Sequence, residues 1–97
     1  MITSININEL KKIQEKINII DLRSEEKYNN KHIQNAINIP SNKLLLSPEK
    51  YLKKDTRYYL YCQKGMNSYS VCKILSKLGY KVTNIIGGYE SWIMNSY

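Results

Sequence analysis

The chain has 97 residues, 42% of them hydrophobic, and its 15 basic and 8 acidic residues give a formal net charge of +7. This length suits one small domain, residues 1–97, and the composition argues against a disordered chain. No apolar run approaches the roughly 20 residues of a membrane span, and the N-terminus lacks the charged-then-apolar order of a signal peptide. With 2 cysteines, a disulfide framework is not expected, and the sequence predicts a soluble protein of the reducing cytoplasm.

The positive charge is spread along the chain and is carried almost entirely by lysine, since only Arg23 and Arg57 are arginines. Proteins that recognise nucleic acid usually cluster Arg and Lys on one face and use Arg for two-pronged contacts to bases. The scattered lysines therefore indicate a solvated surface and no specific nucleic-acid site. Such a surface still favours small anionic substrates.

Strands and helices are predicted to alternate along the chain. In chain order, we expect a strand at 2–7, a helix at 8–16, a strand at 17–22, a helix after Ser24, a strand at 36–39, a helix after Ser47, a strand at 57–61, a helix at 68–78, a strand at 81–86 and a helix from Gly87. The strand segments are short, rich in β-branched or aromatic residues, and bounded by polar or glycine positions.

The helix at 68–78 has the clearest signal. Its apolar stripe is formed by Val71, Cys72, Leu75 and Leu78. Gly79 follows at the expected position of a C-terminal cap. Ser24 and Ser47 are expected to cap the N-termini of earlier helices, because acidic residues follow each of them in the first turn. Its place on the stripe makes Cys72 a predicted core cysteine.

Alternating strands and helices are typical of βαβ units, whose parallel strands form a sheet covered by helices on both faces. We therefore predict the α/β class, with a central parallel sheet of about five strands. In open sheets of this kind, ligands bind beyond the carboxyl ends of the strands, at helix N-termini. Cys62 directly follows the predicted strand at 57–61 and should lie at such an end.

Cys62 is the strongest candidate for a functional residue. After it comes a polar loop that leads into a helix and consists of Gln63, Lys64, Gly65, Met66, Asn67 and Ser68. Backbone N–H groups of such a loop and of the first helical turn point at the sulfur, and the helix dipole adds partial positive charge. This arrangement stabilises a thiolate and predicts nucleophilic sulfur chemistry at Cys62.

Four motifs follow one another across most of the chain. They are residues 19–23 (IIDLR), 31–40 (KHIQNAINIP), 59–68 (YLYCQKGMNS) and 87–92 (GGYESW). In this order they resemble the single-domain rhodanese (sulfurtransferase) family, with its Asp-x-Arg strand end, its Gly-His-Ile-x-Gly-Ala-x-Asn-Ile-Pro segment, its cysteine loop and its closing Gly-Gly-x-x-x-Trp. The resemblance implies a rhodanese-like fold.

The resemblance also implies a sulfurtransferase. Cys62 would take a sulfane sulfur from thiosulfate, a polysulfide or a protein persulfide, hold it as a persulfide, and pass it to a thiol or another nucleophile. Backbone N–H groups of residues 63–68 would bind the persulfide and the departing anion, and the Ser68 hydroxyl would cap the helix and reach the sulfur. Asp21 and Arg23 are expected to tie loops together by an ion pair or hydrogen bonds. No metal or organic cofactor is implied, and the oligomeric state stays open.

The loop departs from the family pattern at Asn67, where Cys-x-x-Gly-x-Arg-Ser usually has arginine. An arginine would bind an anionic donor through a charged fork, whereas asparagine offers only neutral hydrogen bonds. Lys64 would partly substitute if it faces the pocket. We therefore expect weak use of thiosulfate, or a less charged donor. Lys31 and Asn35 replace two common glycines, and Asn35 tolerates a left-handed turn.

Two alternatives to a sulfurtransferase are open. A phosphatase or arsenate reductase needs arginine at the sixth position after the cysteine, which is Ser68 here, so this class is disfavoured. A catalytically weak docking or regulatory module is favoured by the missing loop arginine and disfavoured by the retained Cys62. His32, the one histidine, is expected to be structural, and Trp92 is expected to anchor the core.

Overall fold

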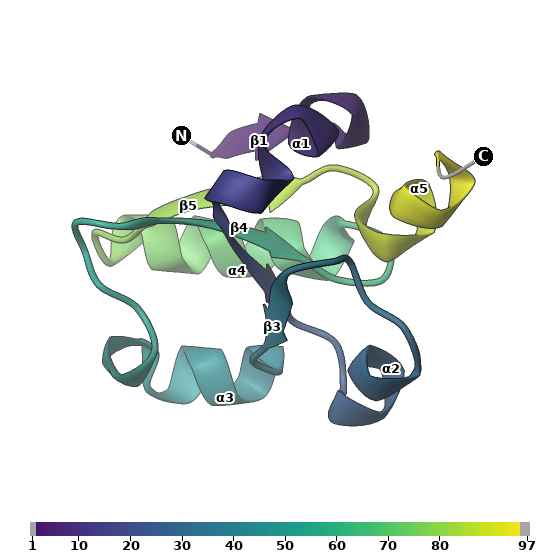
Figure 1. Ribbon diagram of the computed structural model, residues 1–97. Helices are drawn as coiled ribbons and strands as arrows, with labels where there is room; N and C mark the ends of the chain where they lie inside the picture. The colour runs from purple at the N-terminus through teal and green to yellow at the C-terminus, as the bar shows by residue number, and fades with distance from the viewer. Residues whose placement is uncertain (1, 96–97) are drawn as a thin grey trace.

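The computed structural model describes residues 2–95, which form a parallel sheet of five strands in the order β1-β5-β4-β2-β3 (Figure 1). The strands are β1 Thr3–Ile5, β2 Asn18–Asp21, β3 Ala36–Asn38, β4 Arg57–Tyr61 and β5 Lys81–Ile85. The helices are α1 Ile7–Ile13, α2 Glu25–Asn30, α3 Ser41–Leu46, α4 Met66–Lys77 and α5 Gly88–Met94, with 3-10 turns η1 at Gln14–Lys16 and η2 at Pro48–Lys50. The predicted α/β class and parallel sheet are confirmed.

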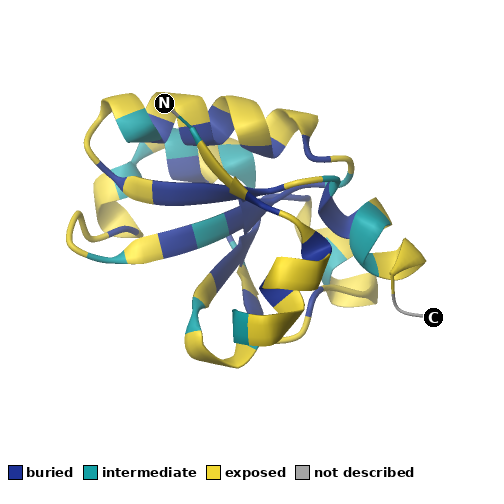
Figure 2. Ribbon diagram, turned by 90° about the horizontal axis from the view of Figure 1, so that it is seen from above, coloured by how far each residue is buried: buried dark blue, intermediate teal, exposed yellow. Residues whose placement is uncertain are grey.

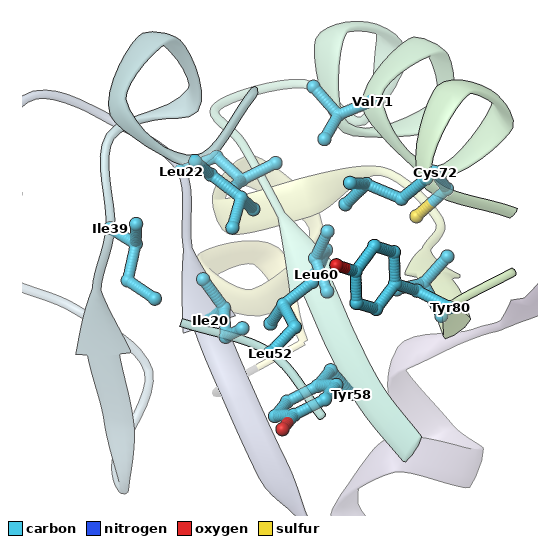
Figure 3. Close-up of a cluster of buried hydrophobic side chains, with 12 residues drawn as sticks. Ile20, Leu22, Ile39, Leu52, Tyr58, Leu60, Val71, Cys72 and Tyr80 are labelled. Atoms are coloured by element: carbon cyan, nitrogen blue, oxygen red, sulfur yellow. The ribbon is translucent and has the colours of Figure 1, made fainter. Parts of the chain in front are cut away.

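Helices cover both faces of the sheet, and each face has its own apolar core. The α4-side core contains Leu44 of α3 and Leu75 of α4. Ile20, Leu60 and Val71 belong to the same core (Figure 3). The α5-side core includes Ile7 and Leu10 of α1 and Tyr89 of α5, with Ile19, Tyr61 and Ile85 from the strands. Successive strand residues point to opposite faces, so the central strands are buried along most of their length (Figure 2).

The longest helix begins earlier than its apolar stripe indicates. α4 starts at Met66 because Gly65, at φ +94°, turns the chain directly into the helix. At its other end Leu78, which was predicted to be part of the stripe, is 50% exposed, so this expectation was wrong. The chain turns at Gly79, and the ring of Tyr80 occupies the α4-side core there.

Of the two helices between β2 and β4, capping signals predicted α2 and missed α3. The hydroxyl of Ser24 accepts the N–H of Lys27 and caps α2, as expected. Ser47 makes no such bond, and only the 3-10 turn η2 follows it, so the helix expected there was wrong. The missed helix is α3, which has no side-chain N-cap bond and no acidic residue in its first turn. It is held by packing of the buried Leu44, which local signals do not reveal.

Among residues 2–95, no helix is both long and apolar enough to cross a bilayer.

Candidate active site

Cys62 lies where β4 ends, in the middle of the sheet's carboxyl edge. Strand β4 is flanked by β5 and β2, so elements from both sides converge on this point. The residue is 6% exposed. The chain then passes through Gln63 and Lys64 to Gly65 and enters α4. The residue therefore stands between a buried strand and a helix N-terminus, at the place where open parallel sheets bind ligands.

Two backbone amides point at the sulfur. The N–H groups of Gly65 and Ser68 donate to Sγ of Cys62, with N–S distances of 3.1 and 3.2 Å. The second amide belongs to the first turn of α4, where the helix dipole is positive. Both features favour negative charge on the sulfur. The Ser68 hydroxyl lies 3.3 Å from Sγ, but it does not cap α4, so this part of the expectation was wrong.

A cleft with a volume of about 540 Å³ opens in front of Cys62. It is lined by Leu22, Arg23, Ser24, Lys27, Cys62, Gln63, Lys64, Met66 and Asn67. Arg23, Lys27 and Lys64 supply the positive charges, so Lys64 does face the pocket. Nδ2 of Asn67 donates to the Ser41 hydroxyl at 3.4 Å. The cleft therefore offers an anion three cations without the usual loop arginine.

A second cleft, of about 560 Å³, adjoins the first on the α5 side. The two clefts share Arg23, Lys27, Gln63 and Lys64. The second one adds Lys31 at its wall, and Glu90 is its acidic residue. The two neighbouring clefts thus share three cationic residues, Arg23, Lys27 and Lys64.

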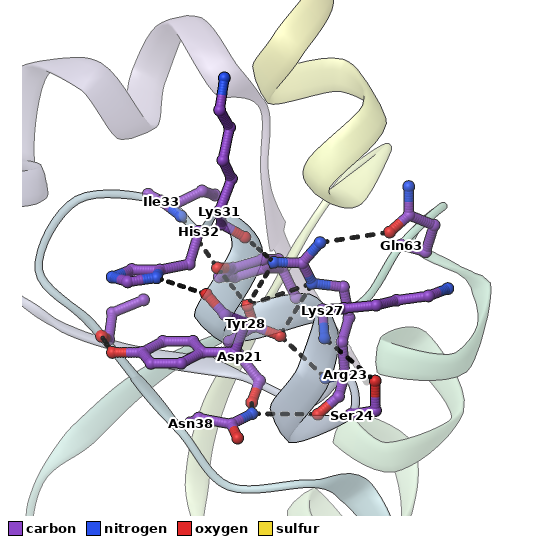
Figure 4. A network of polar contacts seen from close by, with 12 residues as sticks. Asp21, Arg23, Ser24, Lys27, Tyr28, Lys31, His32, Ile33, Asn38 and Gln63 are labelled. Atoms are coloured by element: carbon purple, nitrogen blue, oxygen red, sulfur yellow. Dashed lines mark hydrogen bonds and ion pairs between the residues drawn. The ribbon is translucent and has the colours of Figure 1, made fainter.

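Arg23 and Asp21 form a buried ion pair beside the active-site loop (Figure 4). Nη2 of Arg23 lies 2.8 Å from the carboxylate and donates a further bond of 2.6 Å to the carbonyl of Lys31. Nη1 donates to Oε1 of Gln63 at 3.3 Å. Burial by itself lowers the pKa of Arg23, but the bonds and charge of Asp21 outweigh burial and raise it. The expectation that this pair ties loops together is confirmed.

Tyr61 extends the same network into the α5-side core. Its hydroxyl donates to the Asp21 carboxylate at 2.6 Å and accepts the N–H of Ile33 at 3.0 Å. Burial, followed by the bond to Asp21, raises the pKa of Tyr61 far above its ordinary value. The guanidinium of Arg23 also lies 4.1 Å from the ring centroid of Tyr89 on α5. One buried carboxylate thus joins β2, β4, the chain after α2 and the active-site loop.

The first residues of α5 support the loop from behind. The N–H of Tyr89 donates to the carbonyl of Cys62 at 2.9 Å, and the N–H of Glu90 donates to the carbonyl of Gln63 at 3.0 Å. The closing Gly-Gly segment, which the sequence singled out by resemblance alone, therefore has a structural task. It positions the backbone that carries the nucleophile.

Sequence reasoning missed Leu22, Ser24 and Lys27 in the cleft wall, and it also missed Asn84 of β5. Asn84 is buried, and its Oδ1 lies 2.6 Å from Oγ of Ser68. Its Nδ2 donates to the carbonyl of Gly65 at 3.5 Å. The available signal was a pair of polar residues, Thr83 and Asn84, that stands between the apolar Val82 and Ile85 of one strand. Thr83 lies on the other side of the strand and bonds to the hydroxyl of Thr3 and to Arg57.

Other singled-out residues lie outside the site. His32 stacks on Tyr28 with ring centroids 3.8 Å apart, and its Nδ1 is 2.8 Å from the Tyr28 carbonyl, which supports a structural role. Cys72 is fully buried in the α4-side core, where burial and then the charge of Cys62 raise the pKa of its thiol to about 12. Trp92 is partly buried and packs against the α5-side core. Asn35 adopts the left-handed conformation at φ +75°.

No group of three or more His, Cys, Asp or Glu side chains within residues 2–95 is arranged to bind a metal ion.

Comparisons with known proteins agree with this geometry. The family model for the rhodanese-like domain matches residues 6–95. The chain is 36% identical over 80 residues to YtwF of Bacillus subtilis, which is named as a sulfurtransferase, and the match covers 80% of this chain and 75% of YtwF. It is 37% identical over 75 residues to the thiosulfate sulfurtransferase GlpE of Coxiella burnetii, covering 76% of this chain and 69% of GlpE.

A solved structure extends the agreement to the whole fold. The crystal structure of a rhodanese-related protein from Thermoplasma volcanium matches with a TM-score of 0.88 and 32% identity, covering 98% of this chain and 94% of that one. Taken with the cysteine loop at the end of β4 and the family model, this match shows that the chain belongs to the rhodanese-like domain family.

Proposed function

We propose that this protein is a sulfurtransferase that carries a sulfane sulfur on Cys62. One observation carries the proposal: Cys62 lines an open cleft, and its Sγ accepts the N–H groups of Gly65 and Ser68. A sulfur atom so placed is both accessible to a donor and stabilised as an anion. Membership of the rhodanese-like family, with relatives named as sulfurtransferases, supports the same activity.

The reaction has two half-steps that conserve charge. The Cys62 thiolate attacks the outer sulfur of the donor, a Cys62 S–S bond forms, and the donor's own bond to that sulfur breaks. The electron pair leaves with the donor, as sulfite from thiosulfate or as a thiolate from a persulfide. An acceptor thiolate then attacks the terminal sulfur and regenerates the Cys62 thiolate. The two amides stabilise the charge that moves on and off the sulfur in both steps.

The donor is an anion of modest charge. Arg23, Lys27 and Lys64 line the cleft, so a negative group is attracted there. Arg23 is already bonded to Asp21, Lys31 and Gln63, so few of its N–H groups are free for a ligand. Asn67 adds no charge. We therefore propose that a singly charged donor, either a monoprotonated polysulfide or a protein persulfide, loads Cys62 better than the doubly charged thiosulfate does.

We further propose that the protein acts in a reducing compartment such as the cytoplasm, with a thiol as acceptor. Cys62 and Cys72 are both free thiols. A carrier that alternates between thiolate and persulfide depends on surroundings that do not oxidise it to a disulfide.

Intact mass spectrometry of the reduced protein tests the proposal. Wild type is incubated separately with thiosulfate and with polysulfide, beside Cys62→Ser and Cys72→Ser. We expect a gain of one sulfur, about 32 Da, that is absent only in Cys62→Ser. Cys72→Ser is the matched control, because it replaces the other buried thiol and leaves the loop unchanged. Absence of the adduct with both donors would contradict loading by either of them.

A docking or regulatory module is the second candidate, favoured by the neutral Asn67 in the cleft lining. Alkylation of Cys62 by iodoacetamide across pH separates the two. A half-point near that of an ordinary thiol, about pH 8.5, favours the module, and a clearly lower one favours the enzyme. A phosphatase is disfavoured because the loop has no arginine. Release of phosphate from an aryl phosphate by wild type, but not by Cys62→Ala, would support a phosphatase after all.

A further inference from the structure

The hydroxyl of Ser68 can donate one hydrogen bond, and three possible acceptors lie near it. Oγ of Ser68 lies 2.6 Å from Oδ1 of Asn84, 3.2 Å from the carbonyl oxygen of Gly65 and 3.3 Å from Sγ of Cys62. An amide oxygen can only accept, so the short contact to Asn84 requires the hydroxyl to donate. In the structure, the Ser68 proton therefore points at Asn84 and away from the sulfur.

The orientation of the Asn84 amide is fixed by its second contact. Nδ2 faces the carbonyl oxygen of Gly65 at 3.5 Å. The reverse orientation would place the amide oxygen against that carbonyl oxygen and leave both without a proton between them. Because Asn84, Ser68 and Cys62 are all buried, an unsatisfied acceptor here is costly. Oδ1 is therefore held toward Ser68.

This arrangement turns a lone pair of Ser68 Oγ toward the sulfur. The neutral thiol of Cys62 donates its S–H to that lone pair at 3.3 Å. A thiolate has no proton to donate. It is stabilised most if the Ser68 hydroxyl rotates and donates a hydrogen bond to it, because hydrogen bonds to charged groups are stronger than those between neutral groups. That rotation would deprive Asn84 of its partner. Asn84 and the Cys62 thiolate thus compete for one proton.

We propose that Asn84 is a positioning residue that acts through Ser68 to set the balance between the thiol and thiolate of Cys62. While Asn84 binds the hydroxyl proton, Ser68 accepts from the thiol; when the thiol proton leaves to water, the hydroxyl rotates to the sulfur and Asn84 Oδ1 gives up its bond. The proposal rests on Cys62 as the nucleophile of the proposed function. It needs no sulfur donor for its test.

The other charged and titratable groups near Cys62 do not change when Asn84 is replaced. Arg23, Lys27 and Lys64 line the cleft in front of the sulfur, and Cys72 of α4 is close enough for the charge of Cys62 to raise its pKa. On the α5 side, the carbonyl of Cys62 accepts the backbone N–H of Tyr89. Asn84 also bonds the carbonyl of Gly65, whose N–H donates to the sulfur, so a shift is assigned to the hydroxyl of Ser68 only by comparison with a background that lacks this hydroxyl.

The test measures the rate of alkylation of Cys62 by iodoacetamide against pH, with the modified peptide quantified by mass spectrometry. Asn84→Leu keeps the branching of the side chain at Cγ and removes the acceptor, so we expect the half-point to fall by about one pH unit, a tenfold change in the thiolate equilibrium. Asn84→Asp binds the proton more strongly and adds a negative charge, so we expect the half-point to rise. The opposite signs distinguish this role from simple loosening of the fold.

A double-mutant cycle shows whether the effect passes through Ser68. In the Ser68→Ala background, Asn84→Leu should leave the half-point unchanged, because no hydroxyl remains to be released. Thr83→Val is the matched control, since Thr83 is a buried polar neighbour on the other side of β5 and should not shift it. An equal shift with and without the Ser68 hydroxyl overturns the proposal, as does an unshifted half-point in folded Asn84→Leu. If the half-point shifts as expected in the Asn84 variants but wild type transfers no sulfur, the proposed function is contradicted and the role of Asn84 is not.

Discussion

Gly88 packs directly on the backbone of Cys62. A Cβ at position 88 would overlap the carbonyl oxygen of Cys62 and lie 2.9 Å from the amide nitrogen of Gly65. The same carbonyl accepts the N–H of Tyr89 at 2.9 Å. The nucleophile is thus positioned by a contact between two stretches of main chain, and this approach is possible because glycine has no side chain.

Replacing Gly88 by alanine should therefore damage both stability and activity. Gly88 has φ +59°, and its Cβ would meet backbone atoms that cannot move aside without displacing the loop. We expect a loss of more than about 2 kcal/mol in the free energy of unfolding, with sulfur loading reduced at least tenfold in the folded fraction. Urea unfolding and intact mass spectrometry measure the two effects.

Gly79→Ala is the control for backbone strain alone. Gly79 also has a positive φ, +97°, but a Cβ there would meet only the flexible side chain of Lys54, at 3.7 Å. We expect a loss of about 1–2 kcal/mol in stability and unchanged loading of Cys62. Equal effects of the two substitutions on loading would show that the contact at Gly88 does not position the nucleophile.

Asn67→Arg should improve the use of thiosulfate. Asn67 lies in the first turn of α4 and lines the cleft in front of Cys62. An arginine there adds a fixed charge and a planar set of donors for the sulfonate end of the donor. We expect KM for thiosulfate to fall about tenfold, measured by steady-state transfer to cyanide. Asn67→Gln, which lengthens the side chain without adding charge, is the control and should leave KM unchanged. A KM of Asn67→Arg equal to that of wild type would be evidence against a donor bound in the cleft.

Asp21→Asn should destabilise the fold strongly. The substitution leaves the buried guanidinium of Arg23 without its counter-charge and weakens the 2.6 Å bond from Tyr61. Removing one partner of a buried ion pair costs about 3–5 kcal/mol, which urea unfolding would measure. Asp55→Asn is the matched control, because Asp55 is exposed and should change stability by less than about 0.5 kcal/mol. Similar values for both variants would mean that the buried pair contributes little.

Stability should decline at alkaline pH partly because of Cys72. Burial raises the pKa of this thiol to about 12, well above the value of about 8.5 for an ordinary thiol, so the unfolded chain loses the proton first. Its contribution is complete below about pH 8.5 and is lost as pH rises toward 12, at up to about 1.4 kcal/mol per pH unit. Cys72→Ala should lower stability at pH 8 but flatten the decline between pH 9 and 11, as measured by urea unfolding. Parallel curves for wild type and variant would contradict this assignment.

Local patterns predicted most of the elements that surround the site. The strand at 57–61 was predicted with its observed bounds, and Ser24 caps α2 as expected. Local patterns failed at α3, whose one buried side chain is held by distant partners, and at Leu78, where the chain turns out of the helix and Tyr80 fills the core. These failures have one cause, because burial of a side chain depends on neighbours that are remote in sequence.

By itself, the sequence determined the alternation of strands and helices, the place of Cys62 between them, and the family motifs, because residue order and periodicity are local properties. Only the tertiary structure decided which amides point at the sulfur, which cations line the cleft, and that Asn84 and Gly88 belong to the site. Asn84 is 16 residues from Ser68, and Gln63 is 40 residues from Arg23. Such contacts exist once the sheet is assembled, because packing of β5, α5 and β2 around β4 brings these residues within bonding distance.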